Sequence, residues 1–149
     1  MCLRYFNPAG AHPSGEIGEN PKGVPDNLMP FLAQVAGGHR PALTVFGNDF
    51  ETRDETGERD YIHVVDLARA HLAAIEHVRT NSGFQVFNIG TGRGVTVLEL
   101  AAAFTRMSGR AIATTVTARR SGDLARFYAN AQRAEKTLVW TAQKSLFDI

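Results

Sequence analysis

The order of apolar runs along the chain constrains its fold most strongly. Short runs rich in β-branched and aromatic residues alternate with stretches whose apolar residues recur every three or four positions. The first pattern is typical of buried strands and the second of amphipathic helices. This alternation predicts an α/β fold with at least some parallel strand pairing. The expected strands are 3–6, 42–46, 61–65, 84–89 and 112–118, and the expected helices are 28–36, one that Asp66 caps, 96–108 and 130–138.

Local signals predict where the helices begin and end. Asn27 and Asp66 are natural N-cap residues, and Thr96 stands three residues before Glu99, the spacing of a capping box. Gly109 is expected to end the helix that this box opens. The helix after Asp66 places several residues on one shared face, namely Leu67, Ala70, His71, Ala74, Ile75 and Val78.

Two long polar segments are expected to be loops. Residues 7–25 are rich in proline and glycine and follow the first expected strand, which we expect to be buried. Residues 49–60 follow a turn signal, Gly47-Asn48-Asp49, and contain many charged side chains.

A glycine cluster at residues 90–94 lies between an expected strand and an expected helix. A dinucleotide-binding fingerprint needs glycine at its first, third and sixth positions and an acidic residue roughly 20 residues later. Here the sixth position is Val95, and no acidic residue stands between Glu99 and Asp123. We therefore expect a tight strand-to-helix turn and not a cofactor site.

The composition sets broad limits on the function. The 149 residues are 44% apolar and 21% charged, with a net charge of +1. These values are ordinary for one soluble globular domain and give no sign of a nucleic-acid-binding surface. The single cysteine, Cys2, excludes an internal disulfide and fits a reducing compartment. No apolar run approaches the roughly 18–20 residues of a membrane span, and no signal peptide is visible, so we expect a cytoplasmic protein with no membrane partner.

Signatures of independent catalysis are missing from the sequence. The five histidines show no metal-ligand spacing such as H-E-x-x-H, and His63 and His71 are expected to be packing residues. Neither G-x-S-x-G nor the phosphate-cradling G-K-[ST] is present. Arginines and asparagines beside the expected loops remain as candidate functional residues.

Six motifs, in order along the chain, resemble the UDP-glucose 4-epimerases, which are extended short-chain dehydrogenases/reductases. The resemblance extends from residue 3 to about residue 146. Two of the motifs are shared with related sugar-nucleotide dehydratases and decarboxylases, namely RDYIHVxDL at 59–67 and NIGTG at 88–92. The more specific motifs are YFNPxGAxPSG at 5–15, NLMP at 27–30, FGND at 46–49 and RRxGD at 119–123.

The resemblance implies the C-terminal part of such an enzyme. Residues 1–149 would then comprise the last strands and helices of a Rossmann-type sheet together with the small domain that binds the UDP-sugar. By this comparison the N-terminal NAD-binding part is missing, and the chain is expected to be truncated at both ends. Strand edges that the absent part would cover are expected to be exposed, which would favour aggregation or association with a partner chain.

The resemblance also implies roles for particular residues. Rigid guanidinium groups suit the diphosphate of a UDP-hexose, and an amide side chain can both donate and accept hydrogen bonds. The implied roles are a diphosphate clamp for Arg59 and Arg120, a ribose or uridine acceptor for Asp123, sugar and phosphate contacts for Asn7 and Asn27, a uracil pocket for Phe46 and Leu28, and a passage beside the nicotinamide for Tyr5 and Phe6.

Taken alone, four of these residues have simpler explanations. Asn27 could be only a helix cap, and Phe46 could be ordinary core. Asp123 could be a turn residue, and Arg59 could be a charge on a strand edge. Their joint occurrence in family order favours the functional interpretation.

One departure from the family pattern bears on the sugar. Phe127 stands four residues after Asp123, where the family has either tyrosine or a small residue beside the hexose. A small residue there makes room for an N-acetyl group, whereas Phe127 fills the space. We therefore expect a preference for UDP-glucose and UDP-galactose over the N-acetyl sugars.

A larger departure concerns the catalytic residues. The family uses NAD with a Tyr-x-x-x-Lys pair, in which the tyrosine takes the sugar hydroxyl proton while the nicotinamide takes the hydride. Each of the three tyrosines, Tyr5, Tyr61 and Tyr128, lacks a lysine four residues later. We therefore assign no catalytic residue, and we expect this chain alone neither to bind NAD nor to catalyse epimerisation.

Three interpretations remain open from the sequence. The chain could be part of an epimerase, either a piece of a gene product or one half of a split enzyme that pairs with an N-terminal half or a second copy. It could be a UDP-sugar-binding module without chemistry. It could also be part of a related decarboxylase or dehydratase, although residues 5–15 and 27–30 favour an epimerase.

Overall fold

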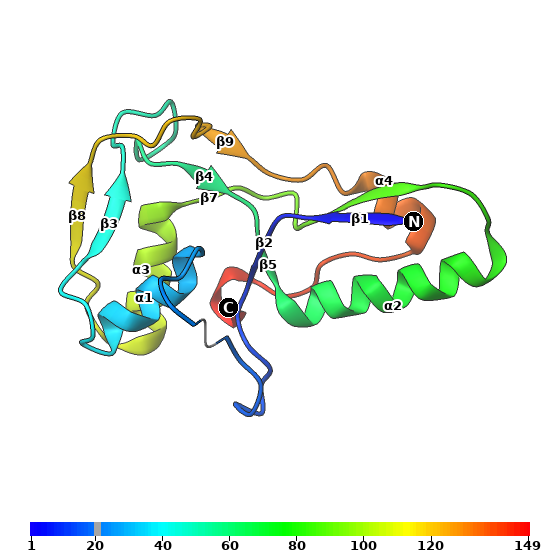
Figure 1. Cartoon of the computed structure of the whole chain (residues 1–149), viewed down its shortest axis with the longest axis horizontal. Helices are drawn as coiled ribbons and strands as arrows, with labels where there is room; N and C mark the ends of the chain where they lie inside the picture. The colour runs from blue at the N-terminus through cyan, green and yellow to red at the C-terminus, as the bar shows by residue number, and fades with distance from the viewer. Residues whose placement is uncertain (20–21) are drawn as a thin grey trace. The chain divides into compact units, whose positions relative to one another are not determined.

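The computed structural model describes residues 1–19 and 22–149, and it divides into two units (Figure 1). Unit 1 comprises Met1–Ile17, Asp60–Gly94 and Tyr128–Ile149, and unit 2 comprises Gly18–Arg59 and Val95–Phe127. Within the described residues four strand pairs are parallel and one is antiparallel. The α/β fold with parallel pairing that the sequence predicts is therefore confirmed.

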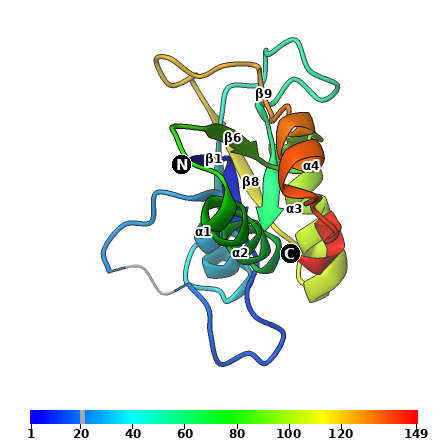
Figure 2. The same ribbon diagram turned by 90° about the vertical axis from the view of Figure 1, so that its right-hand side faces the viewer.

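Unit 1 contains two pairs of parallel strands and the longest helix. Strand β1 (Cys2–Tyr5) pairs with β6 (Val86–Ile89), and β2 (Asn7–Ala9) pairs with β5 (Tyr61–His63). Helix α4 (Gln132–Leu138) packs against β6 and against α2 (Val64–Thr80), the helix that Figure 2 shows end-on. The helices are α2 (Val64–Thr80), α4 (Gln132–Leu138) and the short 3-10 turn η1 (Leu146–Asp148), and the core includes Ile62, Phe87, Ile89, Ala134, Leu138 and Trp140.

Unit 2 contains two helices and two small sheets. Helix α1 (Leu28–Ala36) packs against α3 (Val97–Ser108) and against β3. Strand β3 (Leu43–Phe46) pairs in parallel with β8 (Thr114–Thr117). Strand β4 is central in the second sheet, which consists of β4 (Glu58–Arg59), its antiparallel neighbour β7 (Val95–Thr96) and its parallel neighbour β9 (Arg126–Phe127).

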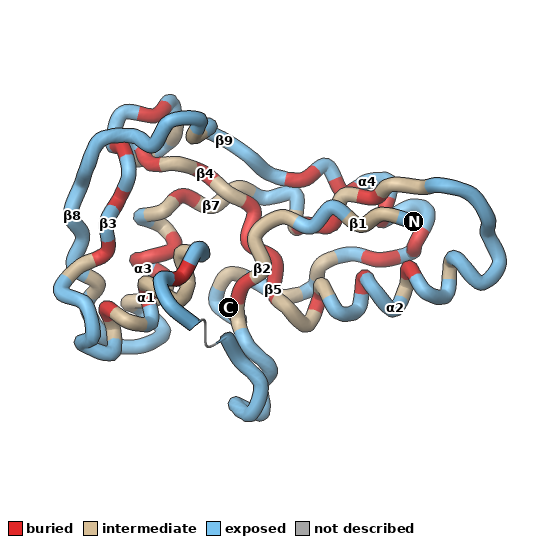
Figure 3. The backbone as a smooth tube through the Cα atoms, in the orientation of Figure 1, coloured by how far each residue is buried: buried red, intermediate tan, exposed pale blue. Residues whose placement is uncertain are grey.

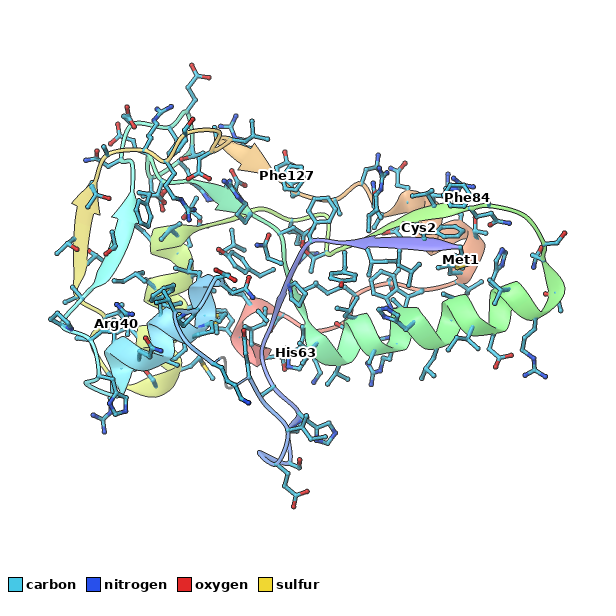
Figure 4. The ribbon with its side chains drawn as sticks, in the orientation of Figure 1. Met1, Cys2, Arg40, His63, Phe84 and Phe127 are labelled. Carbon is cyan, nitrogen blue, oxygen red and sulfur yellow. The ribbon has the colours of Figure 1, made fainter. Side chains whose placement is uncertain are left out.

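The helix signals were predicted with mixed success. Helix α1 has the expected bounds, and α3 begins with the expected capping box and ends at Gly109, whose φ of 68° is left-handed. Asn27 occupies the N-cap position of α1, but its side chain forms no cap hydrogen bond. Asp66 is wrong as the cap of α2, because His63 is the N-cap and its Nδ1 accepts a hydrogen bond from the Val65 amide at 3.1 Å (Figure 4).

Parts of both expected loops form strands. Asn7–Ala9 is β2 and Glu58–Arg59 is β4, although both were expected in loops. Each is only two or three residues long and is held by partners far away in the sequence, β5 and β9. Such short strands carry no periodic pattern, because a period of two needs more residues to be visible.

Burial of the first strand and of α2 differs from expectation (Figure 3). Strand β1 is half-buried to exposed, since β6 is its one partner among the described residues, and Tyr5 is 53% exposed. Helix α2 buries Ala70 and Ala74, whereas Ile75 and Val78 from the same predicted face are exposed. The predicted face is therefore only partly a core face, and His71 on it is exposed as well.

The glycine cluster wraps around a buried carboxylate. Asp60 is 0% exposed, and it accepts hydrogen bonds from the amides of Thr91 (2.9 Å), Gly92 (3.0 Å) and Ala129 (3.1 Å) and from Thr91 Oγ1 (2.6 Å). A Cβ on Gly90 would lie 2.5 Å from Asp60 Oδ2. The expected turn follows β6, but it leads first into the two-residue strand β7 and only then into α3. Its amides point at a carboxylate of the same chain.

Asp66 organises the C-terminal segment in a similar way. Its buried Oδ2 accepts hydrogen bonds from the amides of Gln143 (2.8 Å) and Lys144 (2.7 Å). Its backbone oxygen accepts a hydrogen bond from Trp140 Nε1 at 3.2 Å. The carboxylate therefore serves a segment more than 70 residues away and not the start of its own helix.

Replacing Asp60 with asparagine should destabilise the protein strongly. The amide keeps one acceptor oxygen and turns an N–H₂ group toward backbone donors, so buried N–H groups lose their partner. We expect the free energy of unfolding in urea to fall by roughly 3 kcal/mol or more. Asp26→Asn, at an exposed position, is the matched control and should change stability little. Equal stability of the two variants would contradict the role of Asp60.

Candidate functional site

Four residues predicted to bind the UDP-sugar form one contact cluster in unit 2. The Arg120 guanidinium lies over the Phe46 ring, with Cζ 4.6 Å from the ring centroid. Arg120 Nε donates to Asp123 Oδ2 at 3.0 Å, and Arg59 Nη2 donates to Asp123 Oδ1 at 3.5 Å. We call Phe46, Arg59, Arg120 and Asp123 the arginine cluster.

The strands explain why these residues meet. Phe46 ends β3, and residues 119–123 follow β8, its parallel partner. Arg59 ends β4 and lies opposite Phe127, which ends the parallel strand β9. Each group thus stands at or just after the carboxyl end of a parallel strand, which is where open α/β sheets bind their ligands.

Arg59 is held more firmly than Arg120. Arg59 Nη1 donates to the backbone oxygens of Glu58 (2.9 Å) and Leu124 (2.8 Å), and its side chain is 20% exposed. The Arg120 side chain is 60% exposed. Arg59 therefore lies on a central strand as a fixed, mostly buried cation and is not a charge on a strand edge.

The simpler explanations for Phe46 and Asp123 fit less well. Phe46 is 39% exposed, whereas its neighbours in the strand and turn, Val45 and Phe50, are 1% and 4% exposed. Asp123 does follow a turn, but its carboxylate bridges two arginines. Phe46 is therefore partly exposed, with Arg120 over its ring, whereas ordinary core residues are buried.

The contacts of a further arginine, Arg119, which the sequence did not reveal, support this cluster. Arg119 stacks over the buried Phe50 ring at 4.0 Å, and its Nε donates to Asp49 Oδ1 at 2.5 Å. Arg119 Nη2 also donates to the Asp49 backbone oxygen. Gly47, with φ of 82°, passes so close that a Cβ there would lie 2.6 Å from Arg119 Cγ. We call Arg119, Asp49 and Phe50 the turn clamp.

The polar segment before β4 is held by an ion-pair network. Arg53 bonds Glu58 Oε1 at 3.0 Å and Glu99 Oε2 at 2.5 Å, and Glu58 also pairs with Arg126 at 3.4 Å. The hydrogen bonds from Arg53 lower the pKa of Glu99 from 4.5 to about 2 and raise the pKa of Arg53. The pair therefore stabilises the fold above pH 4.5 and loses this effect as the pH falls toward 2, although solvent screening keeps the contribution small.

The remaining predicted site residues lie outside the arginine cluster. Asn27 is exposed and Leu28 is half-buried at the start of α1 in unit 2. Tyr5, Phe6 and Asn7 belong to unit 1, where the Phe6 amide donates to Ile89 O (3.2 Å) and the Asn7 amide donates to Asp60 O (3.0 Å).

The described residues contain neither a metal cluster nor a membrane-spanning helix. Residues 1–19 and 22–149 contain no group of three or more His, Cys, Asp or Glu side chains that could hold a metal ion. No helix in the same residues is long and apolar enough to cross a bilayer.

Comparisons with known proteins agree with the motifs. The model of the NAD dependent epimerase/dehydratase family matches residues 1–90. The chain belongs to this family. A UDP-glucose 4-epimerase of Cyamopsis tetragonoloba is 56% identical over 144 residues, which cover 96% of this chain. The structure of a family member from Stenotrophomonas maltophila, a UDP-glucose-4-epimerase with bound NAD and formylated UDP-arabinopyranose, superimposes with a TM-score of 0.95 and 49% identity over 98% of this chain.

A second structure of the family carries the nucleotide itself. The UDP-glucose 4-epimerase of Bifidobacterium longum in complex with NAD+ and UDP matches with a TM-score of 0.93 and 50% identity over 98% of this chain. The chain spans only 41% of the length of the C. tetragonoloba relative and 43–44% of the two structures. The family member described here therefore corresponds to less than half of each relative.

The turn clamp can be tested with two glycine substitutions. Gly47→Ala and Gly38→Ala both force alanine into a left-handed conformation, which costs about 1–2 kcal/mol. Gly38 has open space around it, whereas a Cβ on Gly47 would also meet Phe50 Cε2 at 2.8 Å. We expect Gly47→Ala to lower the free energy of unfolding by roughly 1–3 kcal/mol more than Gly38→Ala. Equal losses in urea titrations would contradict the clamp.

Proposed function

We propose that this chain supplies the UDP-hexose site of a UDP-glucose 4-epimerase, within a whole protein that interconverts UDP-galactose and UDP-glucose with NAD. The observation that carries the proposal is the arginine cluster, in which an accessible aromatic ring, a carboxylate and two guanidinium groups from separate segments meet. These are the groups that a base, a ribose and a diphosphate need.

Each member of the cluster has a chemical task in this proposal. The Phe46 ring would stack on uracil, because base–aromatic stacking is favourable for any base. Asp123 would accept hydrogen bonds from the ribose hydroxyls. Arg59 and Arg120 would bind the diphosphate, since planar guanidinium groups match phosphate oxygens with two parallel hydrogen bonds. Leu28 would border the uracil, and Asn7 and Asn27 would contact sugar hydroxyls and phosphates.

The Asn27 side chain does not cap helix α1, the simpler role considered for it. The side chain forms no cap hydrogen bond with α1, so its amide is available for a ligand at the exposed start of the helix. The first backbone N–H groups of a helix also favour negative charge nearby. This supports a phosphate contact for Asn27.

The residues present fit only part of NAD. Tyr5 is exposed and, with Phe6, stands at the carboxyl end of β1, where these two residues would border the nicotinamide. The amides of the glycine-rich turn are bonded to Asp60 and do not offer a diphosphate site. When bound to the whole protein, NAD would accept and return the hydride of the sugar. This chain would orient the sugar nucleotide for that step and hold no catalytic pair of its own.

The second candidate function is a UDP-sugar-binding module without catalysis, because no Tyr-x-x-x-Lys is present in the sequence. A related decarboxylase or dehydratase is favoured less, since the motifs at 5–15 and 27–30 and the names of the similar relatives point to epimerases. We further propose that the chain works in the cytoplasm together with an N-terminal half or a second copy.

Calorimetric titration with UDP-galactose in the absence of NAD tests the proposal. We expect saturable binding that Arg120→Ala weakens roughly tenfold or more, because a charge-assisted hydrogen bond to phosphate is lost. Arg110→Ala removes the same charge from an exposed position after α3 and should leave the affinity unchanged. A folded chain that gives no heat of binding would sink the proposal, and steady turnover with NAD added would refute the expected inactivity.

Phe127 is proposed to select the sugar. Its ring is 51% exposed beside Arg59 in the strand register, so it can border the hexose. We expect UDP-galactose to bind roughly tenfold more tightly than UDP-N-acetylgalactosamine, because the ring takes the space of an N-acetyl group. Phe127→Ala should bring the two dissociation constants closer together. Similar affinities of the unchanged chain for both sugars would count against this role.

A further inference from the structure

We propose that Arg120 makes the site selective for nucleoside diphosphates over nucleosides. In the free protein its side chain contacts the Phe46 ring and the Asp123 carboxylate, the two groups that a nucleoside would bind. Its guanidinium covers the Phe46 ring at 4.6 Å and binds the Asp123 carboxylate at 3.0 Å. The proposal rests on UDP-hexose binding by unit 2, the function proposed above.

In the free protein the members of the arginine cluster bind one another. The ring face that would stack on a base is covered by a cation, which an aromatic face attracts. The carboxylate that would receive ribose hydroxyls already accepts from Arg120 and from Arg59. A nucleoside must therefore displace the Arg120 side chain before it can bind in the same place.

The two arginines differ in their freedom to move. Arg59 is 20% exposed and donates to two backbone oxygens, so it stays with Asp123. Arg120 is 60% exposed. When Arg120 leaves, the Asp123 carboxylate keeps one cation, so no charge is left unpaired. Moving Arg120 is therefore cheap, provided that its guanidinium finds a new partner.

The turn clamp restricts this movement to the side chain. Arg119, the preceding residue, is fixed on Phe50 and Asp49, and the Gly47 amide donates to Thr117 O at 2.9 Å. The backbone before Arg120 is thus anchored to the turn that follows Phe46. The Arg120 backbone therefore stays in place, and only its side chain moves from the Phe46 ring to a ligand.

A diphosphate supplies the new partner and a nucleoside does not. Phosphate oxygens accept two parallel hydrogen bonds from one guanidinium, whereas Asp123 is shared between two arginines. Since a ligand shifts an equilibrium only by its different affinity for the two states, UDP can move Arg120 and uridine can only compete with it. Arg120 should therefore strengthen the binding of UDP and weaken the binding of uridine.

Titrations of the full chain with uridine and with UDP test this prediction. Arg120→Ala should weaken UDP binding tenfold or more and tighten uridine binding about threefold to tenfold, the factor expected for losing one exposed cation–π contact and one exposed ion pair. Arg110→Ala, which removes the same charge elsewhere in unit 2, should change neither constant. Weaker, equal or undetectable uridine binding by Arg120→Ala would overturn the proposal while UDP-hexose binding stands.

Two further results are decisive. A folded chain that does not bind UDP would overturn the proposed function and this inference together. Independently of any ligand, the Arg120 side-chain protons should show an upfield ring-current shift in the NMR spectrum of the free protein. Phe46→Leu and the addition of UDP should each remove this shift. Ordinary Arg120 shifts in the free protein would overturn the inference even if Arg120→Ala fails to fold.

Discussion

The buried carboxylate of Asp60 is the interaction on which unit 1 depends most. It accepts hydrogen bonds from the amides of Thr91 and Gly92 and from the amide of Ala129, which lies 69 residues after Asp60 in the sequence. Four hydrogen bonds from polar groups compensate for the hydration that the buried carboxylate has lost. Because a side chain at Gly90 would collide with the carboxylate, the glycine is fixed by packing and not by a bound phosphate.

Unit 2 depends in a comparable way on two consecutive arginines, Arg119 and Arg120, which have different roles. Arg119 lies on a buried ring and binds one side chain and one backbone oxygen, which makes it structural. Arg120 lies on an accessible ring and shares its carboxylate, which leaves it ready to change partners. A lysine could replace neither residue fully, because a compact ammonium cannot stack on a ring and donate sideways in one plane.

Features with local causes could be predicted from the sequence, and features with distant causes could not. Helix α1 follows from its apolar periodicity, and α3 follows from its periodicity and its capping box. The cap of α2 was placed wrongly because the Asp66 carboxylate binds Gln143 and Lys144, which no local pattern reveals. The motifs predicted that Phe46, Arg59, Arg120 and Asp123 belong to one site, and in the structure these four residues are in contact. The turn clamp was missed, although Gly47 between Phe46 and Phe50 and the Arg119-Arg120 doublet were visible signals.

The two units also differ in what they require from other chains or segments. The arginine cluster and the turn clamp are built from residues of unit 2 alone, so neither depends on a residue of unit 1. Unit 1 instead exposes Leu72, Ile75 and Val78 on one stripe of α2, and Phe84 is 81% exposed near the start of β6. Exposed apolar surface of this kind favours association. A partner would therefore add stability to unit 1 first, whereas the contacts within the arginine cluster of unit 2 do not depend on it.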